Sequence, residues 1–565
     1  MKILVFFLMA ASAACAAPSI SKSSLQQQFQ EQFQSSRIQF PDESSPFRTK
    51  NAGRYSVFLK VFFQNILGWV PDGAGRRLTE ECEPEVWGRR IQDERIKKSV
   101  QLQGALIQKY FRDCAEQLET GDHGDFKNLS RMMSMKLEPE ENPFLHPVIF
   151  HLPGNVKLKG LLALKGDFKK RPLVVLRLGV FSNVQEFLPE RPWFMMLFEQ
   201  SPFNVLVLEN MSSSDFIANN SKFSFGGYDE GIQNILIAQM LKDPNEPLHR
   251  IVESLHLFGI SLGGHGVFYA SMLNDLNSPK LKPLYQSFMA MCPVVKLEAS
   301  MHALSRDKPF AYAVDLWSRK RLAGIGEKMP AVNDHESFGF LEKTVSEVAR
   351  TYTGGLSFVS SVKLPEGVKD SAQFWKLNDF WSSYKSVREP VLVFATHDDP
   401  IVSYSINSEN LQNHQLKIDS SNISVVDFTF GIHCTLPIPY DWKALSTLLQ
   451  SYILSHSPGF KIRQQSFEIE LGKSRQTPEW KMRVLPLEAK STFVKLEIEV
   501  KSAAIEAEKF NLNLPLSQFD FRFLNHQISS SEEWMIERWV NQNVQVQILN
   551  RDGKAHLKAS WPVAL

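Results

Sequence analysis

Beyond its first 20 residues, the sequence has no apolar run of the roughly 18 residues that a bilayer-spanning helix needs. It also has no excess of charge of one sign, because 63 Lys and Arg residues face 61 Asp and Glu residues. The first absence argues against a polytopic membrane protein. The second gives no electrostatic reason to expect a nucleic-acid partner.

Cysteine is scarce, and only Cys82, Cys114, Cys292 and Cys434 lie beyond the N-terminal segment. They are too few and too scattered for a disulfide scaffold or a metal cluster. Cys82 and Cys114 lie in one segment and could bridge in an oxidising compartment. Cys292 lies in an apolar run, SFMAMCPVV, and is predicted to be a small buried hydrophobe. With no Gly-rich phosphate cradle in the sequence either, we expect no metal and no organic cofactor.

The first 16 residues place one lysine before an apolar stretch that ends in small residues, the pattern of a secretory signal peptide. Cleavage after Ala16 predicts an exported protein, periplasmic or secreted. A second interpretation takes residues 12–15 as a lipoprotein box, with a lipid on Cys15 that would attach the chain to a membrane. A third is a buried N-terminal helix. The sequence leaves the oligomeric state open.

The rest of the chain falls into three segments that differ in composition and hydrophobic pattern. Residues 17–145 begin with a Ser/Gln-rich segment, predicted to be a loosely held polar arm, and continue as a helical extension. Residues 146–458 alternate apolar β runs with helical segments, which predicts an α/β domain on a doubly wound, mostly parallel sheet. Residues 459–565 show the short alternating runs typical of an antiparallel β-sandwich.

One connection within the α/β segment, between the strands expected at 286–295 and 390–396, is about ninety residues long, too long for a plain loop. We predict a helical lid over about residues 299–385, and a purely structural insertion is the alternative. The segment is rich in large aromatic residues: Trp317, Phe338, Phe340, Phe374, Trp375, Phe380 and Trp381.

The clearest chemical signal is the G-x-S-x-G element Gly259-Ile260-Ser261-Leu262-Gly263, which lies between an apolar strand and a predicted helix. A serine that attacks carbonyl groups has to stand on a tight strand-to-helix turn, where glycines avoid a clash of β-carbons. This context predicts Ser261 as a nucleophile. A glycine-rich turn with an idle serine is the alternative.

A serine nucleophile needs a base, and the base needs an orienting acid. Asp399 follows the strand PVLVFATH and His433 follows the strand ISVVDFTF, which gives the chain order Ser, Asp, His. The rival acids are Asp398, next to Asp399, and Glu298, after an earlier strand. A further histidine, His265, is predicted to lie on the helix after Ser261 as a packing or pocket residue.

An oxyanion formed at the substrate carbonyl needs two N–H donors. The backbone of Leu262, directly after the nucleophile at a helix start, is one candidate. The turn after the strand RPLVVLR offers the other, through Val180 after Gly179. Leu178 stands where many enzymes of this kind carry histidine, and a backbone donor is unaffected by that change.

This pattern resembles the α/β-hydrolase superfamily over about residues 146–458. GISLGG, the stretch FWSSYKSVREPVLVFATHDDPIV and GIHC are also similar to one esterase branch of that superfamily, from which the chain departs at Ile432 and at Thr435-Leu436. The resemblance implies an esterase- or lipase-like serine hydrolase with Ser261, Asp399 and His433 as its triad.

The expected substrate is a small-molecule or lipid ester, since an apolar, aromatic lid favours an acyl chain over a sugar or a highly charged group. Peptidase or amidase activity is the nearest alternative, because the same triad serves both reactions. A non-catalytic envelope scaffold, with the C-terminal β domain as its binding element, is a third possibility.

Overall fold

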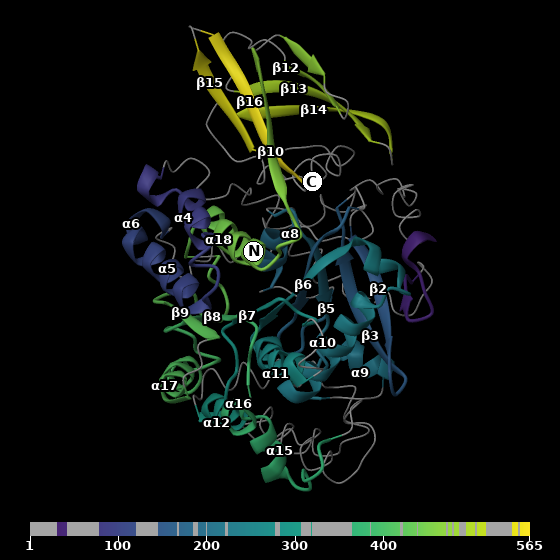
Figure 1. Cartoon of the computed structure of the whole chain (residues 1–565), viewed down its shortest axis with the longest axis vertical. Coiled ribbons are helices and arrows are strands. Elements are labelled where there is room, and N and C mark those ends of the chain that lie inside the picture. The colour runs from purple at the N-terminus through teal and green to yellow at the C-terminus, as the bar shows by residue number, and fades with distance from the viewer. Residues whose placement is uncertain are drawn as a thin grey trace, which may run out of the picture.

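The structure is a computed structural model, in which a central sheet crosses the molecule with helices around it (Figure 1). The residues it describes are 31–41, 78–119, 145–165, 169–184, 190–198, 201–220, 224–276, 283–306, 318, 364–384, 386–418, 422–437, 439–470, 473–476, 480–484, 493–502, 505–515, 545–551 and 554–564. Within these ranges, no helix combines the length and the apolar character needed to cross a bilayer.

The central sheet has nine strands in the order β1-β2-β3-β5-β4-β6-β7-β8-β9. Strands β1, β2, β3 and β5 pair antiparallel, and from β5 through β9 every pairing is parallel. This confirms the predicted mostly parallel sheet. The strands are β1 (Ile38–Gln39), β2 (Leu145–Leu152), β3 (Val156–Ala163), β4 (Arg171–Arg177), β5 (Asn204–Leu208), β6 (Val252–Ile260), β7 (Ser287–Met291), β8 (Val391–Thr396) and β9 (Ile423–Phe428).

The parallel strands are buried because helices cover both faces of the sheet, and β4, β5, β7 and β8 are buried along their whole length. This explains why these strands are apolar runs in the sequence, with polar residues only at their ends. The helices of this part are α8 (Arg191–Phe198), α9 (Ser214–Asn220), α10 (Gly227–Lys242), α11 (Leu262–Leu276), α12 (Leu297–Arg306), α15 (Ser371–Leu377), α16 (Phe380–Ser383), α17 (Ser408–Ile418) and α18 (Trp442–Ser455), with the 3-10 helix η3 (Pro247–Ile251).

The predicted helical extension includes η2 (Glu80–Cys82), α4 (Pro84–Ile91), α5 (Val100–Asp113) and α6 (Ala115–Leu118). Helix α4 packs on α18, and α5 packs on β9, so the extension covers one end of the sheet (Figure 1). Cys82 and Cys114 form a disulfide, the pairing that the sequence leaves open as a possibility.

The polar arm differs from the expectation of a loosely held tether where the structure describes it, over residues 31–41. Ile38 and Gln39 form β1 at the edge of the sheet, and the side chains of Phe33 and Ile38 are buried. Arg37 forms ion pairs with Asp243 and Glu246. The reason is that the few apolar side chains of this arm, which lie among Ser and Gln residues, are buried in the main hydrophobic core.

The C-terminal strands are antiparallel, as predicted. They form a three-stranded sheet, β10-β16-β15, and a four-stranded sheet, β11-β12-β13-β14. The packing of the two sheets into a sandwich and the domain boundaries stay predictions. The strands are β10 (Ile462–Glu470), β11 (Ser474–Gln476), β12 (Trp480–Val484), β13 (Phe493–Ser502), β14 (Ile505–Pro515), β15 (Gln545–Arg551) and β16 (Lys554–Ala564).

Most of the predicted lid, with Trp317, Phe338 and Phe340, lies outside the described residues, as does the predicted signal peptide with Cys15. The described ends of the lid segment are helical, in α12, α15 and α16. Phe380 stacks on Phe268 at a centroid distance of 4.6 Å within the main core, which is a structural role.

Candidate active site

Ser261 occupies the single residue between the end of β6 and the start of α11. Its φ of 56° lies in the left-handed region, as a tight strand-to-helix turn requires. A β-carbon at Gly259 would lie 2.2 Å from the Gly263 carbonyl oxygen, and one at Gly263 would lie 2.5 Å from the Arg177 carbonyl oxygen. Both glycines of the motif are therefore required by close backbone approach.

The structure brings Ser261, His433 and Asp399 together from three separate strand ends. His433 Nε2 lies 2.9 Å from Ser261 Oγ, and His433 Nδ1 lies 2.9 Å from Asp399 Oδ2. With Nδ1–H donating to the carboxylate, Nε2 is free to accept the serine hydroxyl proton. The backbone N–H groups of Ile401 and Val402 donate to Asp399 Oδ1 and fix the carboxylate.

The rival residues are placed elsewhere. The carboxylate of Asp398, an exposed residue, accepts the backbone N–H of Gly431 at 3.2 Å and so supports the histidine loop. Glu298 is exposed on α12, and no hydrogen bond joins it to His433 among the described residues. His265 is fully buried on α11 and donates from Nδ1 to the Val294 carbonyl, a packing role as expected.

The turn after β4 lies against the nucleophile. A β-carbon at Gly179 would lie 3.3 Å from Ser261 Cβ, a tight contact that shows how closely this turn approaches the nucleophile. The N–H groups on either side of Val180 have acceptors, Glu190 Oε1 for Gly179 and Ser212 Oγ for Phe181. Among the described residues, the N–H of Val180 has none. Leu262 begins α11, where first-turn N–H groups lack helical acceptors. Val180 and Leu262 are thus the available donors beside Ser261.

Glu190 was missed by the sequence analysis, because it lies outside any motif. Its buried carboxylate accepts the Gly179 N–H at 3.0 Å and the Ser182 hydroxyl at 2.8 Å, and burial raises its pKa. The carboxyl group therefore holds the turn that presents Val180. The contact between Glu190 and Gly179 is evident only from the three-dimensional structure.

Buried charged and polar side chains also form hydrogen bonds at the carboxyl end of β4. Arg177 is fully buried and its Nη2 donates to Gln233 at 2.9 Å, while Asn210 donates both to Glu230 and to the Leu178 carbonyl. Burial raises the pKa of Glu230 to about 7. Burial, with the nearby Asp215 charge, raises the pKa of Glu209 to about 8.

These pKa shifts predict that the free energy of unfolding decreases as the pH rises from about 6.5 to about 8. In this interval Glu209 is protonated in the folded protein and ionised in the unfolded protein, so raising the pH favours unfolding. Buried histidines have the opposite effect, because burial lowers the pKa of His146 to about 3 and that of His456 to about 4. They make stability increase with pH only below about pH 6.5, the pKa of histidine in the unfolded chain. We expect the melting temperature of the wild type to drop over that interval and the drop to shrink in Glu209→Gln. An equal drop in both proteins would contradict the assignment.

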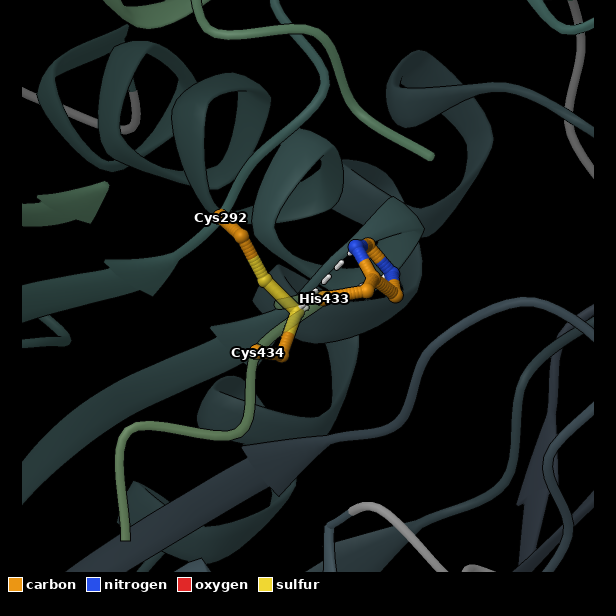
Figure 2. A group of neighbouring side chains, drawn as sticks. All are labelled: Cys292, His433 and Cys434. Atoms are coloured by element: carbon orange, nitrogen blue, oxygen red, sulfur yellow. Dashed lines mark hydrogen bonds between the residues drawn. A yellow bond between two sulfur atoms is a disulfide. The ribbon is translucent and has the colours of Figure 1, made fainter. Parts of the chain in front are cut away.

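A second disulfide joins Cys292, directly after β7, to Cys434, directly after His433 (Figure 2). The prediction that Cys292 is merely a small buried hydrophobe was therefore wrong, because the fold brings two strand-end loops 142 residues apart into contact. Ligand atoms of Cys292, His433 and Cys434 lie within 4.8 Å of one another, a metal-like spacing. Here the sulfur atoms are bonded to each other, and both His433 nitrogens already have partners.

A separate apolar cluster, here called the site cluster, lies beside the donors. Leu262 is one of its buried members, and the half-buried Val180 packs against it. Its residues come from loops and helices after β4, β5, β6, β7 and β8, and from α15 of the lid segment. The carboxyl ends of parallel strands are where open α/β sheets bind ligands. The buried members are Phe181, Phe225, Leu262, Val294, Leu297, Met301, Leu304, Phe374 and Val402.

No family model and no curated protein matches the sequence. Solved structures similar to the chain include an esterase from Pyrococcus furiosus (17% identity, TM-score 0.33), whose alignment covers 56% of this chain and 96% of the esterase. They also include oligopeptidase B from Leishmania major (12% identity, TM-score 0.33), with 56% and 36% of the two chains covered. A putative hydrolase from Legionella pneumophila has 13% identity and a TM-score of 0.36, with 56% and 88% covered.

The fold class rests on the chain's own structure. A mostly parallel sheet lies between helices, and G-x-S-x-G occupies the turn from β6 to α11. Asp399 follows β8 and His433 follows β9, so both stand at strand ends on the same side as Ser261. The chain has the α/β-hydrolase fold.

Proposed function

We propose that this protein is a serine hydrolase that cleaves carboxylic esters through an acyl-enzyme intermediate. The observation that best supports this is the Ser261–His433–Asp399 chain of hydrogen bonds, with distances of 2.9 Å at each of its two links. Ser261 has 6% of its surface exposed and Asp399 has 7%, so the chain of bonds is largely shielded from water.

In the proposed reaction, Ser261 Oγ attacks the ester carbonyl as His433 Nε2 takes its proton. Asp399 keeps Nδ1 protonated and stabilises the imidazolium. His433 then protonates the leaving alcohol, and the acyl group stays on Ser261. Water, activated by His433 in the same way, releases the acid and restores the serine. The proton returns to its starting atom, and the cycle requires no cofactor.

The N–H groups of Val180 and Leu262 are the proposed oxyanion donors. Each such donor contributes about 3 kcal/mol to stabilising the transition state. Glu190 supports this by engaging the neighbouring Gly179 N–H, which fixes the orientation of the turn. Helix α11 begins at Leu262, so the positive end of its dipole also stabilises the negative charge on the oxyanion.

We propose that the substrate carries an apolar acyl group. The side chain of Leu262 belongs to the site cluster and that of Val180 packs against it, so apolar surface adjoins the two backbone donors. We expect kcat/KM for p-nitrophenyl esters to rise by about three- to fourfold per methylene from acetate upward, until the chain fills the available space. The measurement is a series of esters from acetate to palmitate. A flat or falling series would contradict an apolar acyl site.

The choice between ester and amide bonds needs matched substrates. An N-acyl p-nitroanilide with the same acyl group as the best ester tests it directly, since the acyl contacts are equal in both. Turnover of the ester with little of the anilide supports an esterase. Comparable kcat/KM for both would favour a peptidase or amidase, and turnover of neither would favour a scaffold.

Export to the periplasm or the cell exterior is proposed as well. Cys82, Cys114, Cys292 and Cys434, all the cysteines outside the predicted signal, are paired in two disulfides. Disulfides persist in oxidising compartments and are rare in the cytosol. The mass of the protein recovered from its native host tests this, because cleavage after Ala16 and lipid on Cys15 give different N-terminal peptides. An intact N-terminus would contradict both.

A further inference from the structure

We propose that the Cys292–Cys434 disulfide is a positioning element for His433, and that efficient turnover requires it to be closed. The inference rests on the proposed function, since it concerns the base of that reaction. It assigns to the bridge a role in the alignment of the imidazole, beyond the stability that any disulfide contributes.

The first observation is where the bridge is attached. Cys434 is bonded through the backbone directly to His433, and its Sγ lies 3.7 Å from Nε2 and 3.8 Å from Nδ1 of that ring (Figure 2). A covalent anchor at this residue limits how far the imidazole can move from Ser261. Cys434 is fully buried and Cys292 is nearly so, which makes the bridge a fixed part of the interior.

The second observation is what lies at the other end. The carbonyl of Met291, the residue before Cys292, accepts the N–H of Ser261 at 2.9 Å. The N–H of Cys292 itself donates to the Phe394 carbonyl on β8 at 2.7 Å. The bridge therefore ties the base to the same strand end that holds the nucleophile, and that strand end is hydrogen-bonded into the sheet.

The third observation is that the histidine loop needs restraint. Gly431, Ile432 and Cys434 all have positive φ, at 145°, 36° and 58°. This conformation is unfavourable for a β-branched residue such as Ile432, and it persists only where surrounding structure enforces it. Beside the disulfide, the restraints include hydrogen bonds from Thr396 Oγ1 to the Ile432 carbonyl and from Trp193 Nε1 to the Cys434 carbonyl. Without the bridge, we expect the loop to relax and His433 to lose its alignment.

The test compares Cys292→Ala/Cys434→Ala with Cys82→Ala/Cys114→Ala, which removes the other bridge in the helical extension. Both variants are expected to melt at lower temperature than the wild type. Only the first is expected to lose activity, with kcat on the best p-nitrophenyl ester falling about 10- to 100-fold while KM changes little. Wild-type kcat in the first variant would overturn the proposal.

A cycle with His433→Ala separates positioning from general damage. If the bridge acts through His433, its removal in the His433→Ala background should leave the small residual rate unchanged. A further loss of similar size in that background would overturn the proposal.

If the wild type neither turns over esters nor reacts with a fluorophosphonate at Ser261, the proposed function fails. An active wild type with an equally active bridge variant contradicts the positioning role alone.

The same question can be answered without a substitution at Cys292 or Cys434, should that variant fail to fold. In Cys82→Ala/Cys114→Ala only the Cys292–Cys434 bridge remains. Because the bridge is buried, it is reduced stepwise with a phosphine in denaturant and the protein is returned to native buffer, where thiol counting in quenched samples gives the fraction of open bridges and circular dichroism checks the fold. Activity is expected to fall in proportion to that fraction and to return on reoxidation. Full activity with the bridge open would again overturn the proposal.

Discussion

Replacing Ser261 by alanine is expected to lower kcat for ester hydrolysis by about 10⁶-fold, because it removes the atom that forms the acyl-enzyme. The fold should be kept. Ser261 is 94% buried, and the change removes only one hydroxyl whose single described partner is His433 Nε2. Its positive φ is no harder for alanine than for serine.

The measurement is steady-state turnover of the best ester by the wild type and by Ser261→Ala, with thermal melting as the control for folding. A residual rate of about 10³-fold over water would be compatible with the account, since oxyanion donors and substrate binding act without the nucleophile. Retention of a tenth or more of wild-type kcat in a folded variant would contradict the assignment of Ser261.

The second large effect is expected from Asp399→Asn, which should lower kcat by about 10⁴-fold with the fold intact. Asp399 Oδ1 accepts the N–H groups of Ile401 and Val402, so the amide oxygen of asparagine is expected to stay on that side. The amide NH₂ then replaces Oδ2 and donates to His433 Nδ1. The imidazole is left with its proton on Nε2, where it cannot accept the proton of Ser261.

Asp398→Asn is the matched control, because it removes an equal charge one residue away. Asp398 is exposed, and its carboxylate accepts the Gly431 N–H, a hydrogen bond that asparagine can keep. We expect a change of about twofold or less, as for most surface substitutions. Equal losses in the two variants would mean that the charge, and not the tautomer of His433, is what matters.

The sequence predicts the fold well where local pattern and tertiary environment agree. Strands β4, β5, β7 and β8 are buried along their whole length, so their apolar runs are nearly continuous, as in VLVFAT of β8. That Ser261, Asp399 and His433 lie together was predictable for a related reason. Ser261, Asp399 and His433 each follow a parallel strand, and the carboxyl ends of parallel strands meet at one edge of the sheet.

What the sequence could not predict depends on contacts between distant segments. Glu190 acts through the Gly179 N–H, and no motif marks it. Cys292 has the apolar neighbours of a buried hydrophobe, and nothing in its surroundings indicates a partner 142 residues away. The arm residues Phe33 and Ile38 are isolated among polar residues, so their local pattern gives no sign that they are buried.

The most direct test of the central claim is fluorophosphonate labelling of the purified protein, with the modified peptide identified by mass spectrometry. We expect one label, on Ser261, at a rate that falls strongly in His433→Ala and is lost on heat denaturation. A label on another residue, or no label on folded protein that binds and hydrolyses small esters, would contradict it.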